Sequence, residues 1–136
     1  MLILDTNVVS ELRRPEKADP KVATWAASIS IASIFLSAIT ILELELGLCS
    51  VERRDKAQGK ILRAWLEGQV LSRFEGRILP VDTAVARQCA RLHIPDSRGE
   101  RDALIAVTAL VHGMIIVTRN VADFRPMGVS ILNPWS

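Results

Sequence analysis

The stretch from Ser97 to Val117 predicts one helix followed directly by one buried strand. Ser97-x-x-Glu100 has the spacing of a capping box, residues 102–111 are strongly helix-forming, and Gly113 suits a C-terminal cap. Residues 114–117 then form a continuously apolar segment. A strand without polar alternation is buried on both faces, which is typical of a parallel sheet. This unit therefore restricts the chain to an α/β architecture.

Other short apolar segments resemble that strand, with helical patterns between them. The expected strands lie near residues 2–5, 34–37, 77–81, 114–118 and 129–132. Such alternation favours a mostly parallel central sheet of about five strands covered on both faces, a three-layer α/β/α domain. The chain has 136 residues, 49% hydrophobic and 24% charged, so residues 1–136 are expected to form a single domain. Ligands of such folds bind at the carboxyl ends of the strands.

The cysteines and the longest uncharged segment bear on where the protein works. Cys49 and Cys89 lie far apart without a metal-binding pattern, so a reducing cytoplasm is expected. Residues 22–42 carry no charge over 21 positions, the length of a membrane span. Six hydroxyl side chains interrupt that segment. We therefore interpret it as a helix end, a loop and the buried strand 34–37, with no membrane contact.

Four acidic residues stand where composition predicts a buried environment. Asp5 directly follows an apolar run, Glu43 lies among apolar residues, and Asp102 precedes nine uncharged residues. Asp123 lies just beyond the strand expected near 114–118. Acids are seldom left unpaired in a protein interior, and a divalent cation is the usual partner of converging carboxylates. The four acids therefore predict a metal site.

Each acid also has a purely structural interpretation. Thr40-x-x-Glu43 has capping-box spacing, and taken alone this favours Glu43 as a helix cap. Asp102 would also suit the positive end of a helix, although its uncharged neighbours favour a functional role. Asp123 falls in an expected loop, where an aspartate needs no further reason. Asp5 is the hardest to explain in this way, because two more polar residues follow it at the end of the same strand.

The chemistry of the four acids determines which ion and which reaction are expected. Oxygen ligands without histidine or thiolate select Mg²⁺ or Mn²⁺ over zinc. Such an ion activates water and neutralises phosphate charge, so phosphodiester hydrolysis is the expected reaction. Thr6 and Asn7 are expected to orient water at the ion. No phosphate-binding glycine loop and no nucleophilic triad occur, and His93 and His112 are interpreted as surface or capping residues.

Four blocks of residues, in this order, resemble a PIN domain. They are Asp5-Thr6-Asn7, residues 37–44 with Gly47, residues 102–109, and Thr118-Arg119-Asn120-x-x-Asp123-Phe124. Their order and spacing match across essentially the whole chain. Within that family the chain most resembles the VapC-type toxins of bacterial toxin–antitoxin pairs. The closing residues 131–135 are similar to the ending of the FitB-like branch.

The resemblance implies a Mg²⁺- or Mn²⁺-dependent ribonuclease, a homodimer held inactive by a VapB-like antitoxin and reaching operator DNA only through that antitoxin. By motif, Asp5, Glu43 and Asp102 would bind the principal metal, and Asp123 would support it or a second ion. The matching supporting positions are Thr6, Asn7 and Thr118. Exposed apolar surface for the antitoxin or a second protomer is expected near Leu46, Leu48 and Val51.

Basic residues are the expected contacts for RNA, and the net charge of +2 permits such a partner without requiring it. The favoured candidates flank the motif acids: Arg13, Arg14, Arg98, Arg101, Arg119 and Arg125. A second group is predicted to share one helix face and is interpreted as solvated surface in preference to an RNA grip: Arg53, Lys56, Lys60 and Arg63. Glu45 receives no role from the resemblance.

Two other functions fit parts of the sequence. A response-regulator phosphoacceptor domain would use Asp82 with Thr118 as its hydroxyl partner, but it leaves Glu43 and Asp102 unexplained. A catalytically silent PIN-fold module that binds its antitoxin on DNA is the other alternative. The complete set of acids disfavours this module. Loss of an activity on removing one acid, with the partner complex intact, would distinguish the enzyme from the module.

Overall fold

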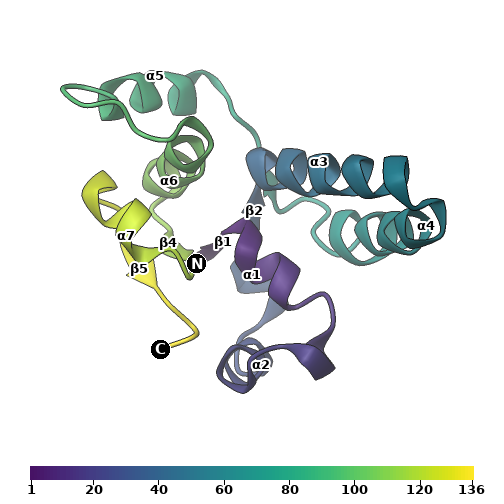
Figure 1. Cartoon of the computed structure of the whole chain (residues 1–136). Helices are drawn as coiled ribbons and strands as arrows, with labels where there is room; N and C mark the ends of the chain where they lie inside the picture. Colours follow the sequence, from purple (N-terminus) through teal and green to yellow (C-terminus); the bar gives the residue numbers. More distant parts are fainter.

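The computed structural model describes residues 1–136 and contains a five-stranded sheet with helices on both faces (Figure 1). The strands are β1 (Leu2–Leu4), β2 (Ile34–Ser37), β3 (Ile78–Leu79), β4 (Ile115–Val117) and β5 (Ile131–Leu132). The sheet order is β3-β2-β1-β4-β5, and every neighbouring pair is parallel. The expected α/β fold is confirmed, and each strand lies at or within its predicted limits.

Helices connect these strands. They are α1 (Thr6–Glu11), α2 (Pro20–Ala27), α3 (Ala38–Arg54), α4 (Lys56–Trp65), α5 (Thr83–Leu92), α6 (Glu100–His112) and α7 (Val121–Phe124). A π-helical segment, Leu66–Leu71, continues α4, and short 3-10 turns lie at Pro15–Lys17, Ile31–Ser33 and Arg125–Met127. None of the helices has both the length and the apolar character needed to cross a membrane.

The two faces of the sheet bury two separate cores, because alternate residues of a strand point to opposite faces. Ile3 of β1 and Ile116 of β4 pack with residues of α5, α6 and α7. Leu4 and Val117, the next residues along the same strands, pack with α1, α3 and the π-helical segment. Figure 1 shows the corresponding layers, with α5, α6 and α7 on one side of the strands and α1 to α4 on the other. The three-layer arrangement is thus confirmed.

Side-chain caps fix where several helices begin, and two of the predicted capping boxes are wrong. Ser37 accepts a hydrogen bond from the Ile39 N–H at 3.0 Å and starts α3, so Thr40 lies inside this helix and is fully buried. Helix α6 begins after Gly99, and Ser97 caps nothing. The Ser97 hydroxyl instead lies 3.4 Å from Nδ1 of His93, the residue at the C-terminal end of α5. His93 Nδ1 also accepts the Arg98 N–H at 2.9 Å, which bends the chain before α6.

Gly113 ends α6 as predicted. Its φ of 66° lies in the left-handed region, which a glycine adopts without steric cost. The chain reverses there and enters β4 two residues later. This confirmed cap sets the register of β4, and with it the position of Thr118 beside the end of β1.

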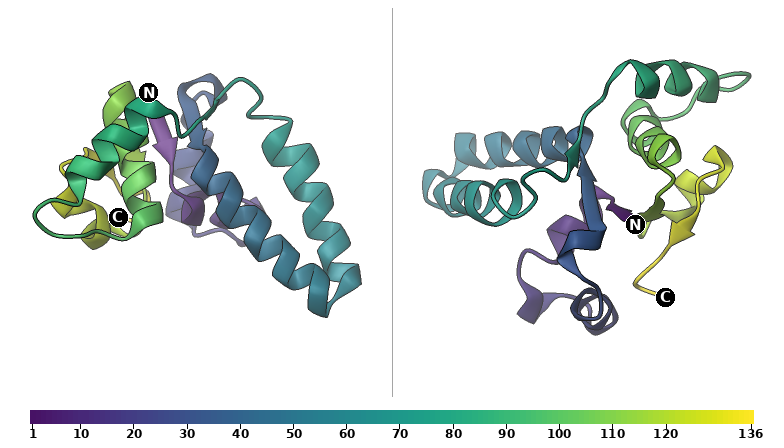
Figure 2. Two further views of the ribbon diagram at one scale, coloured as in Figure 1. Left: turned by 90° about the horizontal axis from the view of Figure 1, so that it is seen from above. Right: turned by 180° about the vertical axis from the view of Figure 1, so that it is seen from behind.

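Helices α3 and α4 lie side by side as a hairpin that projects from the sheet (Figure 2). Their approach is close at Gly59, which is buried. A Cβ atom at this position would lie 2.8 Å from the Glu52 Cα atom of α3, a distance that real Cβ atoms do not reach. A glycine in α4 is therefore required for the two helices to pack at this separation.

Candidate functional site

The carboxyl ends of β1 and β4 meet at one edge of the sheet and place Asp5 beside Thr118. Asp5 is 4% exposed and caps the N-terminus of α1. Its Oδ1 accepts the Thr6 N–H at 2.9 Å, while Oδ2 accepts the Thr118 hydroxyl at 2.8 Å and the Asn7 amide at 3.1 Å. Three donors therefore hold this buried carboxylate in one orientation.

Asp5 keeps a raised pKa in spite of these donors. Burial raises the pKa of Asp5, hydrogen bonds from Thr118 and Thr6 lower it, and repulsion from Asp102 and Glu43 raises it. No lysine or arginine pairs with Asp5. The protein therefore holds a desolvated carboxylate without a cation of its own beside it.

Glu43 lies in the second turn of α3 and faces Asp5 through Thr6. Its Oε1 accepts the Thr6 hydroxyl at 2.6 Å, and its Oε2 lies 3.7 Å from Nη1 of Arg101. The helix-capping interpretation of Glu43 is wrong, because the cap of α3 is Ser37. Thr6 thus links the first motif acid to the second.

Asp102 and Asp123 complete the group of acids from the other side of the sheet edge. Asp102 lies in the first turn of α6, and burial raises its pKa, with the charges of Asp123 and Glu43 raising it further. Asp123 is exposed and lies in α7, so the loop predicted for residues 119–124 is partly helical. The four predicted acids therefore influence one another electrostatically, although they come from β1, α3, α6 and α7.

The donor set suits a hard divalent cation, although its side chains are not arranged as a finished coordination sphere. As they stand, no three acidic, histidine or cysteine side chains lie close enough together to hold a metal ion. Carboxylates without a cation between them repel one another, and Glu43 turns to Thr6 and Arg101. Buried carboxylate oxygens with no nitrogen or sulfur ligand beside them match the preference of Mg²⁺ or Mn²⁺. The chemistry of these acids therefore fits such an ion, whereas their present side-chain positions do not form a binding group.

The three polar residues expected to support the site, Thr6, Asn7 and Thr118, all contact Asp5. Thr118 is fully buried, and its oxygen also accepts the Asn120 N–H at 2.9 Å. Asn7 bridges the two strand ends, since its amide donates to Asp5 and its Oδ1 accepts the Arg119 N–H at 3.4 Å. Every polar atom of these side chains that touches Asp5 is a donor. The bonds from Thr118 and Thr6 lower the pKa of Asp5 and so offset part of the effect of burial.

The family of the chain follows from comparison with known proteins. The PIN domain family matches residues 2–127. The chain belongs to the PIN domain family. It is 38% identical to the VapC ribonuclease Y4jK of Sinorhizobium fredii over 99% of this chain and 98% of that protein. It is 37% identical to the toxin FitB of Neisseria gonorrhoeae over 99% of both chains.

A solved structure has a very similar fold over nearly the whole chain. The crystal structure of FitAcB from Neisseria gonorrhoeae superposes with a TM-score of 0.90 at 35% identity, covering 99% of each chain. The match spans all elements from β1 to the residues after β5. The resemblance to VapC and FitB seen in the sequence is therefore confirmed over the whole chain.

The arginines that flank the acids of this PIN domain differ in their surroundings. Arg101 is 54% exposed and pairs with Glu43, while Arg98 keeps a buried Nε without a hydrogen-bond partner. Arg119 lies over the ring of Trp135. Arg13 lines a cleft of about 280 Å³ together with Thr6 and Glu43. Arg14 and Arg125 are exposed. The flanking arginines for which a contact is described thus lie at or near the acid edge.

The basic group between residues 53 and 63 is not one helix face, contrary to the sequence prediction. Helix α3 ends at Arg54 and Asp55 caps α4, so Arg53 and Arg63 belong to different helices. The expected i, i+3, i+7 face is broken because Asp55 accepts the Gln58 N–H and turns the chain. Lys56 and Lys60 are exposed, as a solvated surface requires.

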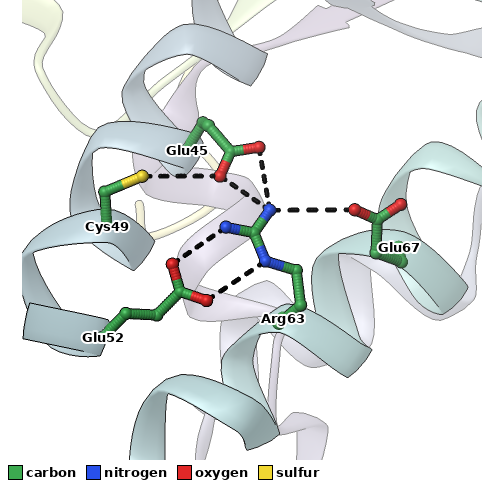
Figure 3. Close-up of polar contacts among 5 residues, drawn as sticks. All are labelled: Glu45, Cys49, Glu52, Arg63 and Glu67. Atoms are coloured by element: carbon green, nitrogen blue, oxygen red, sulfur yellow. Dashed lines mark hydrogen bonds and ion pairs between the residues drawn. The ribbon is translucent and has the colours of Figure 1, made fainter. Parts of the chain in front are cut away.

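Arg63 instead ties α4 to α3 and gives Glu45 a role that the sequence did not supply (Figure 3). Its Nη1 lies 2.7 Å from Glu45, its Nη2 lies 3.0 Å from Glu52, and Glu67 approaches within 3.7 Å. The bonds to Glu52 raise the pKa of Arg63, burial opposes this, and Glu45 adds to the rise. Only the Arg63–Glu67 pair, four residues apart on one helix, was readable from sequence spacing.

The surface expected for a partner is only partly exposed. Leu46 is 48% exposed, whereas Leu48 is buried in the core under the sheet. Leu48 and Val51 both line the cleft that contains Thr6 and Glu43. Apolar surface for a partner therefore adjoins the acid site directly.

Proposed function

We propose that this PIN domain is the toxin of a VapBC-type toxin–antitoxin pair and a Mg²⁺- or Mn²⁺-dependent ribonuclease that hydrolyses RNA phosphodiester bonds. The similarity to the VapC ribonuclease Y4jK and to the toxin FitB supports this assignment. The observation that carries it is chemical. Two carboxylates, Asp5 and Asp102, have raised pKa values at the edge of the sheet where ligands of parallel α/β folds bind, and neither has a basic partner.

Asp5, Glu43 and Asp102 would hold the principal ion, with Asp123 supporting it or a second ion. When bound, Mg²⁺ or Mn²⁺ would activate water as a nucleophile and neutralise charge on the phosphate. Thr118, Asn7 and Thr6 donate to Asp5 and orient its carboxylate. Thr6 also orients Glu43 through its hydroxyl.

Arginines at the same edge would bind the RNA backbone. The candidates are Arg13, Arg14, Arg98, Arg101 and Arg119. Arg101 is the one among them that pairs with a motif acid, at 3.7 Å from Glu43. This long ion pair is weak at an exposed side chain, so Arg101 can turn to a phosphate once a cation neutralises Glu43. Backbone contacts of this kind bring affinity without sequence preference.

The proposed partners are a VapB-like antitoxin, an RNA substrate and a second copy of the chain, with operator DNA reached only through the antitoxin and the cytoplasm as the site of action. An antitoxin segment that fills the cleft of about 280 Å³ would lie against Leu48, Val51 and Glu43. Occupation of this cleft would therefore block access to the acids.

The test compares RNA cleavage by the native chain and by Asp5→Asn in Mg²⁺, in Mn²⁺ and in chelator. Asparagine is as good a helix cap as aspartate, so α1 is expected to survive the change. Asp82→Asn is the matched control, because Asp82 likewise caps a helix, accepting the Val85 N–H at 3.0 Å, and lies outside the acid site.

Metal-dependent cleavage by the native chain and by Asp82→Asn, with loss of activity in folded Asp5→Asn, is expected. Equal activity of all three proteins would remove Asp5 from the site. No cleavage by the native chain under any condition, with the antitoxin complex intact, would favour the catalytically silent binding module.

A further inference from the structure

Two arginine side chains of the protein lie over aromatic rings, and they differ in what their N–H groups do. Arg77 Cζ lies 4.8 Å from the ring centre of Phe74. Its guanidinium donates to the carbonyls of Ile31 and Ile34, both at 2.6 Å, and to that of Arg73. Arg77 is therefore a structural residue whose donors are used within the protein.

Arg119 has the same kind of stacking with unused donors. Its Cζ lies 5.4 Å from the ring centre of Trp135. The guanidinium makes no hydrogen bond and no ion pair within the protein, and the residue is exposed. An arginine carries five N–H donors in a planar fork. Arg119 thus presents that fork to solvent from a partly fixed position.

Both members of this pair are held at the acid edge of the sheet. The backbone N–H of Arg119 donates to Oδ1 of Asn7, and the side-chain amide of Asn7 donates to Asp5 at 3.1 Å. Trp135 follows β5, and its N–H donates to Oδ1 of Asn133 at 2.9 Å. The Trp135 ring also packs against the core beneath α1 and α3. The indole is therefore anchored, and the backbone that carries Arg119 lies next to Thr118 and Asn7, both of which contact Asp5.

Stacking on Trp135 lowers the side-chain entropy that Arg119 loses when it binds a ligand. A free arginine loses side-chain entropy when it is immobilised, whereas a side chain already held by a ring loses less. The planar fork also matches two oxygens of a phosphate. A fixed arginine with free donors beside a site for phosphodiester chemistry therefore has the properties of a backbone docking point.

We propose that Trp135 holds Arg119 as a preformed docking point for an RNA phosphate adjacent to the one that is cleaved. This inference rests on the proposed ribonuclease function and assigns Trp135 as a positioning residue that acts through Arg119. Its ligand is a phosphodiester of single-stranded RNA, because the planar fork matches two phosphate oxygens and Arg119 directly follows Thr118, the residue that donates to Asp5. A carboxylate of a partner protein is the competing ligand, and unchanged RNA affinity in Arg119→Ala would favour it.

The test measures binding of a labelled single-stranded RNA in chelator, so that no cleavage occurs, together with cleavage in Mg²⁺. The variants are Arg119→Ala, Trp135→Leu, Trp135→Phe and the double variant Arg119→Ala/Trp135→Leu. Arg54→Ala removes the same charge at the far end of α3 and is the matched control. Thermal unfolding checks that each variant is folded.

Arg119→Ala should weaken RNA binding by about tenfold, and Trp135→Leu by about two- to fivefold, the range expected for an exposed cation–π contact. Trp135→Phe should restore most of the loss, because it keeps an aromatic face. The double variant should bind no more weakly than Arg119→Ala, since Trp135 acts only through that side chain. Arg54→Ala should change affinity by less than about twofold.

Additive losses in the double variant would overturn the proposal, as would unchanged RNA affinity in Arg119→Ala or in Trp135→Leu. If Trp135→Leu does not fold, Arg119→Lys decides, because it keeps the charge and loses the planar fork. Native affinity in Arg119→Lys would then refute the docking point.

The parallel cleavage assay separates this proposal from the proposed function. Weakened binding in the variants without any cleavage by the native chain would support the docking point and refute the ribonuclease. Cleavage by the native chain with native binding in every variant would do the reverse.

Discussion

Replacing Thr118 by valine tests whether Asp5 is an ionised carboxylate stabilised by donors. Thr118 is fully buried, and its hydroxyl donates to Asp5 at 2.8 Å. Valine has nearly the same shape but no donor. Removing a hydrogen bond to a buried charged group costs about 1.5–3 kcal/mol. For a chain of this length we expect the melting temperature to fall by about 7 °C.

Thr108→Val is the matched control. Thr108 is also fully buried, but its hydroxyl donates at 2.7 Å to the backbone carbonyl of Leu104, one turn earlier in α6. That carbonyl is neutral, and the bond competes with regular helical bonding, so its loss should change stability by less than about 1 kcal/mol. Because the Thr118 oxygen also accepts the Asn120 N–H at 2.9 Å, the difference between the two valine variants measures the loss of both Thr118 contacts, and its pH-dependent part reports the charge on Asp5.

The pH dependence gives a second test of the same reasoning. Because burial raises the pKa of Asp5 in the folded protein, the native state binds the proton more tightly than the unfolded chain does. Ionised Asp5 therefore lowers stability at neutral pH, and this cost is relieved as pH falls through the folded-state pKa. Thr118 offsets part of the cost, so the penalty of Thr118→Val is full near neutral pH and shrinks in acid.

Urea denaturation in chelator at about pH 7 and about pH 4 measures both effects, with unchanged m-values confirming a comparable unfolding reaction. Equal destabilisation by the two valine substitutions, or a Thr118→Val penalty independent of pH, would refute the description of Asp5 as a buried ionised group.

Two further predictions concern helix packing and the metal. Gly59→Ala should destabilise the protein by about 1–3 kcal/mol in urea denaturation, because the new Cβ would lie 2.8 Å from the Glu52 Cα atom. Gly47→Ala is the control: a Cβ there has nothing within 4 Å, so this change should stabilise the protein by up to about 1 kcal/mol. A Gly59→Ala variant as stable as the native chain would contradict the close packing of α3 against α4. Mg²⁺ affinity should fall in acid, since protons compete for Asp5 and Asp102, whose pKa values are raised. Calorimetric titrations with no loss of affinity towards about pH 5 would argue against a shared carboxylate site.

The order and nature of the elements could be predicted from the sequence because the signals are local. Continuously apolar strands such as Ile115–Val117 and the glycine at 113 specify a parallel α/β fold without long-range information. The position of Asp5 beside the residues that follow β4 was also predictable, since carboxyl ends of parallel strands share an edge. The remaining candidate site residues were proposed from the motif order that the chain shares with the PIN domain family.

The errors arose where one pattern allowed two local structures. Thr40-x-x-Glu43 has capping spacing, but Ser37 lies directly at the strand end and starts the helix first. The basic residues 53–63 fit one helix face only if Asp55 is not a cap, and its side chain accepts the Gln58 N–H at 3.1 Å. Spacing cannot decide such competition between neighbouring caps, because tertiary packing determines which helix end forms.

The contact between Arg119 and Trp135 could not be predicted from the sequence, for a different reason. The two residues follow β4 and β5, and a ring over a guanidinium depends on side-chain direction at two separate strand ends. No periodicity encodes that direction. The same holds for Glu45 and Glu52, whose partner Arg63 lies on another helix.

The central position of β1 has a consequence for synthesis of the chain. β1 is made first, yet its neighbour β4 pairs Leu4 with Val117, and Asp5 reaches Thr118 across 113 positions. At about 5–20 residues per second, a growing chain spends several seconds with Asp5 made but Thr118 not yet joined. During that interval neither β4 nor Thr118 is in place beside β1 and Asp5. The group of four acids can therefore assemble only after the last third of the chain has been made and has folded against β1.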